Sequence, residues 1–197
     1  SAEGANPVAR RQGKDLFKAN QITGNMYVIV DLLKGLSARG DFSLANFKYD
    51  NSSFTPQKAI DLTTFDSKNS KLTTSNSNNY NTSLNFRLDY TANINKHMIG
   101  AMVGFGSDRS NYNSSSITYE GFPNDDYLTN PSSAQKVKSY SDLVSKGGLN
   151  SFYSRINYSY DNRYLAELSM RADESSKFGP KNRWGFFPAI SLGWLMS

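Results

Sequence analysis

Hydrophobic and polar residues alternate with a period of two along several stretches of the chain. In residues 83–90 the residues on one side are Leu84, Phe86, Leu88 and Tyr90, and those on the other are polar or charged. Residues 151–160 and 164–173 repeat the pattern. Because successive side chains of a β-strand point to opposite faces, this alternation predicts strands with one apolar and one polar face. Helical periodicity is nearly absent, so the expected fold class is all-β.

The alternation predicts strands joined by connections of alternating length. Strands are expected near residues 24–32, 35–48, 80–92, 97–107, 149–160, 163–173 and 186–196. Short connections are expected at 34–35, 93–96 and 161–162, and long polar ones at 49–79, 108–148 and 174–185. Tight turns at one end and long loops at the other are typical of the antiparallel up-and-down meander of outer-membrane barrels.

The number of predicted strands indicates a segment of a larger protein. Single-chain bacterial membrane barrels have even strand counts of eight or more, and the seven predicted strands do not meet this requirement. The last predicted strand is aromatic and has no partner before Ser197. Because unpaired strand edges promote aggregation, residues 1–197 are expected to be a single barrel segment, with the remaining strands elsewhere.

The amino-acid composition agrees with β-strands that have one face in contact with water. Of the 197 residues, 38% are hydrophobic and 13% aromatic, including 12 tyrosines and 12 phenylalanines. Disordered chains lack aromatic residues. The most apolar stretches, 26–33 and 98–106, are too short for a membrane-spanning helix, whereas a barrel strand needs only about ten alternating residues.

Charge and cysteine content exclude further classes of protein. The net charge of +5 comes from scattered lysines and arginines, with no basic run interleaved with aromatics, so no nucleic-acid partner is expected. The chain has 0 cysteines, which excludes disulfides and thiolate metal sites.

Three groups of polar residues are candidates for catalysis or metal binding. His97 is the only histidine, has no metal partners nearby in sequence, and is expected to be an interfacial turn residue. Glu120 with Asp125 and Asp126 offers oxygen ligands for calcium but lacks the spacing of a calcium loop, so solvated loop charge is favoured. Residues 173–176, Asp-Glu-Ser-Ser, have no histidine nearby to activate a nucleophile. We therefore expect a protein that is not an enzyme and has no metal or cofactor.

The aromatic and charged residues of the last strands predict which face meets lipid. Trp194 is expected in an aromatic girdle at the membrane boundary, and Trp184 is a candidate both for that girdle and for substrate binding by stacking on a sugar ring. No other substrate-binding residue is predicted. Arg155 and Glu167 lie on neighbouring predicted strands and are expected to face inward, because an arginine facing lipid at the midplane would cost roughly 2–4 kcal/mol.

The last quarter of the chain contains its most specific motif. Residues 155–165 read RINYSYDNRYL, residues 171–178 read RADESSKF and residues 183–194 read RWGFFPAISLGW. These phrases resemble RxNYxYxxRY and RxDGSSxF…nRwGxFPSxSxGW of the SusC/RagA-type TonB-dependent (TonB-linked) outer-membrane receptors. Glu174 replaces the usual glycine and Ala189 the usual serine. Looser matches are Asn6-Pro7, Gly24-Asn25 and residues 97–104, HMIGAMVG.

The resemblance implies a fold, a function and a set of partners. The strands would form part of a 22-stranded transmembrane β-barrel in the outer membrane of a Gram-negative bacterium. The complete protein would import large nutrients, typically oligosaccharides or glycans and sometimes peptides, with energy from the TonB complex. A SusD-like surface lipoprotein would cap the barrel, and the plug domain that contacts TonB is expected outside residues 1–197.

Two other interpretations remain open from the residues alone. A soluble β-sandwich, such as a surface or carbohydrate-binding module, would explain the alternation but not the alternating loop lengths. A secreted β-rich hydrolase would need a triad or metal-binding spacing, and the sequence offers neither.

Overall fold

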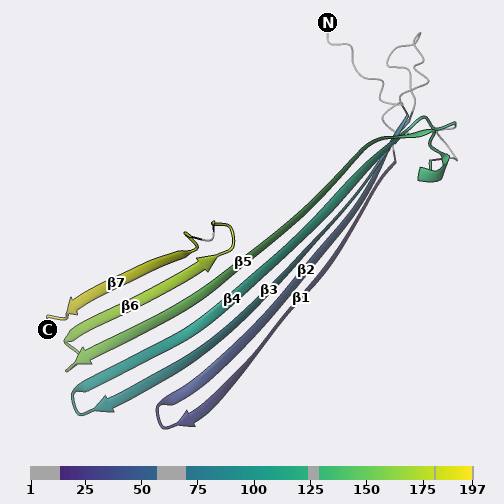
Figure 1. Cartoon of the computed structure of the whole chain (residues 1–197). Helices are drawn as coiled ribbons and strands as arrows, with labels where there is room; N and C mark the ends of the chain where they lie inside the picture. The colour runs from purple at the N-terminus through teal and green to yellow at the C-terminus, as the bar shows by residue number, and fades with distance from the viewer. Residues whose placement is uncertain (1–13, 57–69, 124–128, 180, 197) are drawn as a thin grey trace, which may run out of the picture. The chain divides into compact units, whose positions relative to one another are not determined.

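The computed structural model describes residues 14–56, 70–123, 129–179 and 181–196, and these form an antiparallel sheet (Figure 1). Its strands are β1 (Lys14–Leu33), β2 (Leu36–Thr55), β3 (Lys71–Ile94), β4 (His97–Glu120), β5 (Lys136–Tyr160), β6 (Tyr164–Ser175) and β7 (Trp184–Trp194). A short 3-10 helix, η1 (Pro131–Ser133), precedes β5. The strands pair in chain order from β1 to β7, which confirms the expected all-β up-and-down meander. Within the described ranges, no helix has the length and apolarity needed to cross a membrane.

Short turns join β1 to β2, β3 to β4 and β5 to β6, as the sequence predicts. Gly35 closes the first turn with φ +78°, and its carbonyl accepts a hydrogen bond of 2.7 Å from the Thr91 amide. Asn95, Asp161 and Asn162 also have positive φ angles, between 52° and 53°. Asparagine, aspartate and glycine adopt this left-handed conformation at the least cost, so the turns follow from local sequence.

The strands are longer than predicted, and much of what was predicted as loop is strand. β2 continues to Thr55, β3 begins at Lys71, β4 continues to Glu120 and β5 begins at Lys136. The predicted loops at 49–79 and 108–148 were therefore wrong over these extensions, while residues 57–69 and 124–128 lie outside the described ranges. The third predicted loop, 174–185, shortens to the residues between Ser175 and Trp184.

The extensions of β3 and β4 escaped detection because serine, threonine and asparagine dominate them and leave little alternation. Their side chains pair between strands instead. The Ser75 and Ser116 hydroxyls lie 2.9 Å apart, and the Thr73 and Thr118 hydroxyls 3.2 Å apart. Such cross-strand hydroxyl pairs stabilise a sheet without any apolar face.

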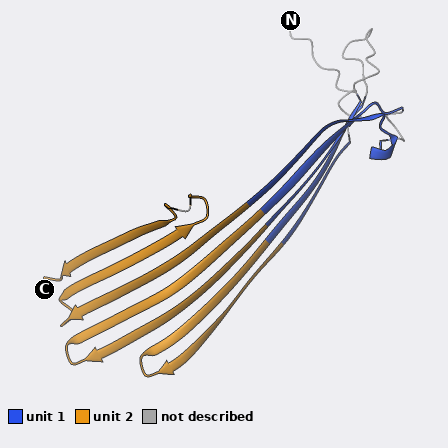
Figure 2. Cartoon of the chain, in the orientation of Figure 1, with its two compact units in different colours: residues 1–21, 46–79, 112–145 blue, residues 22–45, 80–111, 146–197 orange. Residues whose placement is uncertain are grey.

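The described chain divides into two compact units, coloured separately in Figure 2. Unit 1 comprises residues 1–21, 46–79 and 112–145, and contains a small buried core of Phe54, Leu72 and Phe122. The rings of Phe54 and Phe122 meet edge to face at 5.3 Å. The Ser70 hydroxyl, fully buried, accepts a hydrogen bond of 3.0 Å from the Phe122 amide.

Unit 2 comprises residues 22–45, 80–111 and 146–197, and its sheet has an apolar and a polar face. The register pairs Ile156 with Leu168 and Leu168 with Ile190, so these side chains share the apolar face. They are 50%, 49% and 74% exposed. Other exposed members of this face are Phe86, Leu88, Phe152, Met170 and Leu192. A continuous apolar surface of this kind is expected to meet lipid.

Candidate functional site

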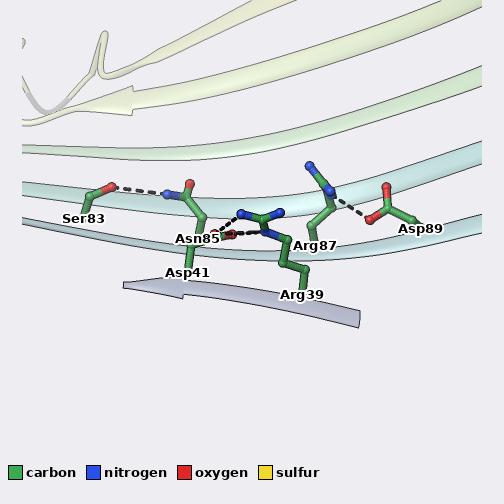
Figure 3. A network of polar contacts seen from close by, with 6 residues as sticks. All are labelled: Arg39, Asp41, Ser83, Asn85, Arg87 and Asp89. Atoms are coloured by element: carbon green, nitrogen blue, oxygen red, sulfur yellow. Dashed lines mark hydrogen bonds and ion pairs between the residues drawn. The ribbon is translucent and has the colours of Figure 1, made fainter. Parts of the chain in front are cut away.

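The polar face of unit 2 has charged pairs that run along single strands (Figure 3). On β2, Arg39 Nη2 lies 2.6 Å from Asp41 Oδ1, and on β3, Arg87 Nε lies 2.7 Å from Asp89 Oδ2. The Asn85 amide donates to the Ser83 hydroxyl at 3.2 Å. Side chains two residues apart share a face of a strand, so each arginine is neutralised by the next residue on its own face.

The polar face continues across β5 and β6. Arg155 Nε lies 3.6 Å from Glu167 Oε1, which confirms that these residues share the face opposite Ile156. Arg171 donates to Asp173 Oδ1 at 2.8 Å and to the Ser151 hydroxyl at 3.1 Å. These pairs are about half-exposed, so each contributes little to stability, roughly 0–1 kcal/mol. Their consequence is a polar surface with little net charge.

Sequence reasoning found the Arg155–Glu167 pair but missed the pairs along single strands. A signal for them was present in the arginine-x-aspartate triplets at 39–41, 87–89 and 171–173. In a strand this spacing places both charges on one face, and each triplet forms a contact in the structure.

A groove of about 540 Å³ lies on unit 2 where β1 to β6 carry small polar residues. Its uncharged polar lining residues are Thr23, Asn25, Ser43, Asn81, Thr82, Ser83, Ser110 and Ser175. Asp108, Arg109 and Lys177 are its charged lining residues. Hydroxyl and amide groups both donate and accept hydrogen bonds, so the groove suits a ligand that does the same.

Two rows of aromatic residues border the apolar face. The turn-end row consists of His97, Tyr158, Tyr160, Tyr164 and Trp194, where the Tyr164 and Trp194 rings stack at 6.4 Å. The loop-end row consists of Phe105, Phe152, Trp184 and Phe186, where Trp184 stacks on Phe152 at 6.1 Å. From Phe152 to Tyr160 the strand spans about 26 Å at roughly 3.3 Å per residue. Such rows flank the apolar band of outer-membrane barrels, which is about 25 Å tall.

The tryptophans and His97 thus lie at the borders of the apolar face. His97 begins β4 and its Nδ1 lies 2.7 Å from the Tyr158 hydroxyl. Trp194 ends β7 in the turn-end row. Trp184 begins β7 with Phe152 and Phe186 against it, and its contact with a sugar ring stays a prediction.

Glu120 is a buried, paired carboxylate, which corrects the expectation of solvated loop charge. Its side chain is 9% exposed and lies 2.6 Å from Lys138 Nζ, with Lys71 Nζ and Lys136 Nζ each at 3.9 Å. The hydrogen bond from Lys138 holds the pKa of Glu120 below its usual value, and the other two lysines add to this effect. Asp125 and Asp126 lie outside the described residues. Within the described ranges, no three metal-ligating side chains cluster together.

The Asp-Glu-Ser-Ser segment forms structural hydrogen bonds. Asp173 accepts from Arg171, and Glu174 Oε2 accepts from the Asn150 amide at 3.0 Å. The Ser176 hydroxyl accepts from the Gly148 amide at 2.7 Å. These hydrogen bonds join the end of β6 to its neighbours, and they do not pair a nucleophile with a base.

Replacing Glu120 with glutamine is expected to loosen the end of β4 in unit 1, because three lysines lose their shared carboxylate. In the unsubstituted protein the same loosening is expected on acidification. A carboxylate whose pKa is lowered on folding contributes stability above its unfolded pKa of about 4.5, and this contribution is lost as pH falls through the lower folded value. Hydrogen exchange of residues 114–122, compared at pH 7 and below pH 4.5, would measure it. Equal protection in the glutamine variant at pH 7 would contradict the expectation.

Comparison with known proteins identifies receptors of the outer membrane. The chain is 32% identical to TonB-dependent receptor P39 of Formosa agariphila over 185 residues, which is 87% of this chain and 16% of the relative. It is 36% identical to TonB-dependent receptor SusC of Bacteroides thetaiotaomicron over 115 residues, or 58% of this chain and 11% of the relative. No protein-family profile matches the chain.

Solved structures agree in fold. A structure of the RagAB peptide transporter superposes with a TM-score of 0.85 at 22% identity, over 93% of this chain and 20% of that one. The RagAB peptide importer in its open-open state gives a TM-score of 0.82. The chain thus spans at most about a fifth of the relatives it matches. Sequence and fold together make it a barrel segment of a SusC/RagA-type TonB-dependent outer-membrane receptor of a Gram-negative bacterium.

Proposed function

We propose that the complete protein imports large nutrients across the outer membrane, and that residues 1–197 supply part of the barrel wall. TonB-dependent receptors among the relatives support this assignment. These relatives are named as receptors and the structural neighbours as transporters, which agrees with a protein that is not an enzyme. The soluble sandwich and the secreted hydrolase do not account for this similarity.

The proposed substrate is an oligosaccharide, and the serine, threonine and asparagine side chains that line the groove on unit 2 are the observation that carries this choice. A sugar presents hydroxyl groups that donate and accept hydrogen bonds, as do the serine, threonine and asparagine side chains of the groove. A peptide is the competing substrate, because the RagAB neighbours are named as peptide transporters.

The proposed partners follow from the same relatives. A SusD-like surface lipoprotein would cover the barrel at its loop end, and the TonB complex would act through a plug domain outside this chain. Lipid of the outer membrane would contact the apolar face. No nucleic-acid partner is proposed, since the polar face of unit 2 pairs its arginines with carboxylates.

The role of the groove in substrate binding is tested by placing a large side chain in it in the complete receptor. Ser43 is half-buried and lines the groove, so Ser43→Phe is expected to weaken oligosaccharide binding at least tenfold, a loss of about 1.4 kcal/mol. Ala189→Phe is the matched control, because Ala189 lies on the polar face of β7 and does not line the groove. Isothermal titration of the purified receptor with neutral oligosaccharides, and separately with peptides, is the measurement.

The outcomes separate the candidate substrates. Tighter binding of a peptide than of any sugar, with the same sensitivity to Ser43→Phe, would replace the oligosaccharide by a peptide. Unchanged binding in Ser43→Phe would remove the groove from the import route. In the same assay, Trp184→Phe lowers sugar affinity only if the tryptophan contacts the substrate, and a membrane-boundary role leaves the affinity unchanged.

A further inference from the structure

A polar cavity lies on the outer side of unit 2, directly beyond the loop-end aromatic row. It measures about 450 Å³, and its charged lining residues are Arg109, Lys146, Glu174 and Arg183. Asn150 also lines the cavity. It lies two positions before Phe152 in β5, so the two side chains are on the same face of the strand. The register pairs Glu174 with Trp184 of the aromatic row. Cationic side chains therefore begin where the apolar face ends.

The Arg109 side chain is held in place by neutral groups. Its Nη2 donates to Asn150 Oδ1 at 2.9 Å and its Nη1 donates to the Asp108 carbonyl at 2.9 Å. Gly148 leaves room for the guanidinium, because a Cβ at that position would lie 3.2 Å from Arg109 Nη1. The carboxylate of the cavity, Glu174, accepts from the Asn150 amide rather than from a cation. Arg109 thus keeps its positive charge uncompensated by an ion pair.

The other two cations have no acceptor in the described part of the chain. Neither Lys146 nor the Arg183 guanidinium has a hydrogen-bond or ion-pair partner there, and Arg183 Nε is buried without one. A buried donor without an acceptor destabilises the protein until a ligand accepts its hydrogen bond. With three cations and one carboxylate, the cavity has a net positive charge and an unused buried donor, which are the features of an anion site.

We propose that this cavity binds a phosphate monoester on the headgroup of the glycolipid in the outer leaflet. The short turns mark the periplasmic end of the strands, so the loop-end row and the cavity lie at the outer leaflet. The lipid of that leaflet is a phosphorylated glycolipid. Guanidinium and ammonium groups are the preferred protein donors to phosphate, and basic pockets at the membrane boundary bind lipid headgroups. The cavity shares Arg109 with the import groove, but Lys146, Glu174 and Arg183 do not line that groove, and the proposal goes beyond import.

The test uses the complete receptor with the double variant Lys146→Gln/Arg183→Gln. Both side chains lack partners, so their replacement is expected to leave folding unchanged. The control, Lys34→Gln/Arg163→Gln, removes the same charge from the turn end of the strands. Native mass spectrometry of receptor in detergent would compare lipid A with its phosphates, enzymatically dephosphorylated lipid A and phosphatidylglycerol.

The expected result is retention of phosphorylated lipid A that falls about thirtyfold in the double variant, which removes two basic residues near a charged lipid surface, and is unchanged in the control. Removing the phosphates from lipid A should have the same effect as removing the two basic side chains. The unsubstituted receptor is therefore expected to retain dephosphorylated lipid A only weakly. Equal retention by the double variant would overturn the proposal. Equal retention of dephosphorylated lipid A or of phosphatidylglycerol by the unsubstituted receptor would also overturn it. None of these outcomes depends on nutrient binding, which the Ser43 experiment measures separately.

Discussion

Replacing Ile156 with arginine in the complete receptor is expected to remove most of the assembled protein from the outer membrane. Ile156 lies on the apolar face between the two aromatic rows, is 50% exposed, and is paired with Leu168. An arginine facing lipid near the midplane costs roughly 2–4 kcal/mol, which is a large share of the total stability of a protein. The measurement is the amount of heat-modifiable receptor in isolated outer membranes.

The matched control is arginine at the adjacent position, Asn157→Arg. Asn157 lies on the polar face and is paired with Glu167, so a new arginine there meets water and a carboxylate. Assembly of this variant is expected to stay close to that of the unsubstituted receptor. Should Ile156→Arg assemble as well as Asn157→Arg, the assignment of the apolar face to lipid would be wrong.

The second large effect is expected at the turn between β1 and β2. Gly35 has φ +78°, and a Cβ at this position would collide with the backbone carbonyl oxygen of Thr91. Gly35→Ala is therefore expected to destabilise the hairpin by about 1–3 kcal/mol from the backbone conformation alone, with the collision adding to it. Because the carbonyl belongs to a paired strand, it is less free to move than a side chain.

Gly24→Ala provides the control within the same hairpin. Gly24 lies in β1, and a Cβ there meets no atom within 4 Å. The measurement is the temperature at which the folded band is lost on semi-native gels. A clear drop for Gly35→Ala with little change for Gly24→Ala is expected, and equal behaviour of the two variants would show that the turn tolerates a side chain.

The strands that carry alternation were predictable from sequence, because burial in lipid on one face imposes it. Ile156, Leu168 and their neighbours follow this rule, and the Arg155–Glu167 pair then follows from the two-residue period. The turns were predictable for a local reason, since glycine, asparagine and aspartate supply the positive φ angles at positions 35, 95 and 161.

The polar extensions were not predictable in this way. Ser75 and Ser116 pair through hydroxyls on one face, while Asn76 accepts from Ser115 on the other, so neither face has an apolar signature. Such a stretch has the composition of a loop, although its backbone is hydrogen-bonded to the neighbouring strands of the sheet. The groove and the Glu120 cluster were missed because they join residues from several strands, and only the register of the folded sheet brings these together.

The polar extensions also bear on how such a receptor can change over evolutionary time. Within the apolar band, inserting one residue moves every following side chain of the strand to the opposite face. Apolar side chains such as leucine then face water, and polar ones face lipid. In a stretch such as residues 73–79 of β3, which contains only threonine, serine and asparagine, both faces are polar, so a change of one residue alters which hydroxyls pair without exposing an apolar side chain of that stretch. Length variation should therefore accumulate in these segments, and related receptors would differ in the length of these strand segments more than in the apolar band.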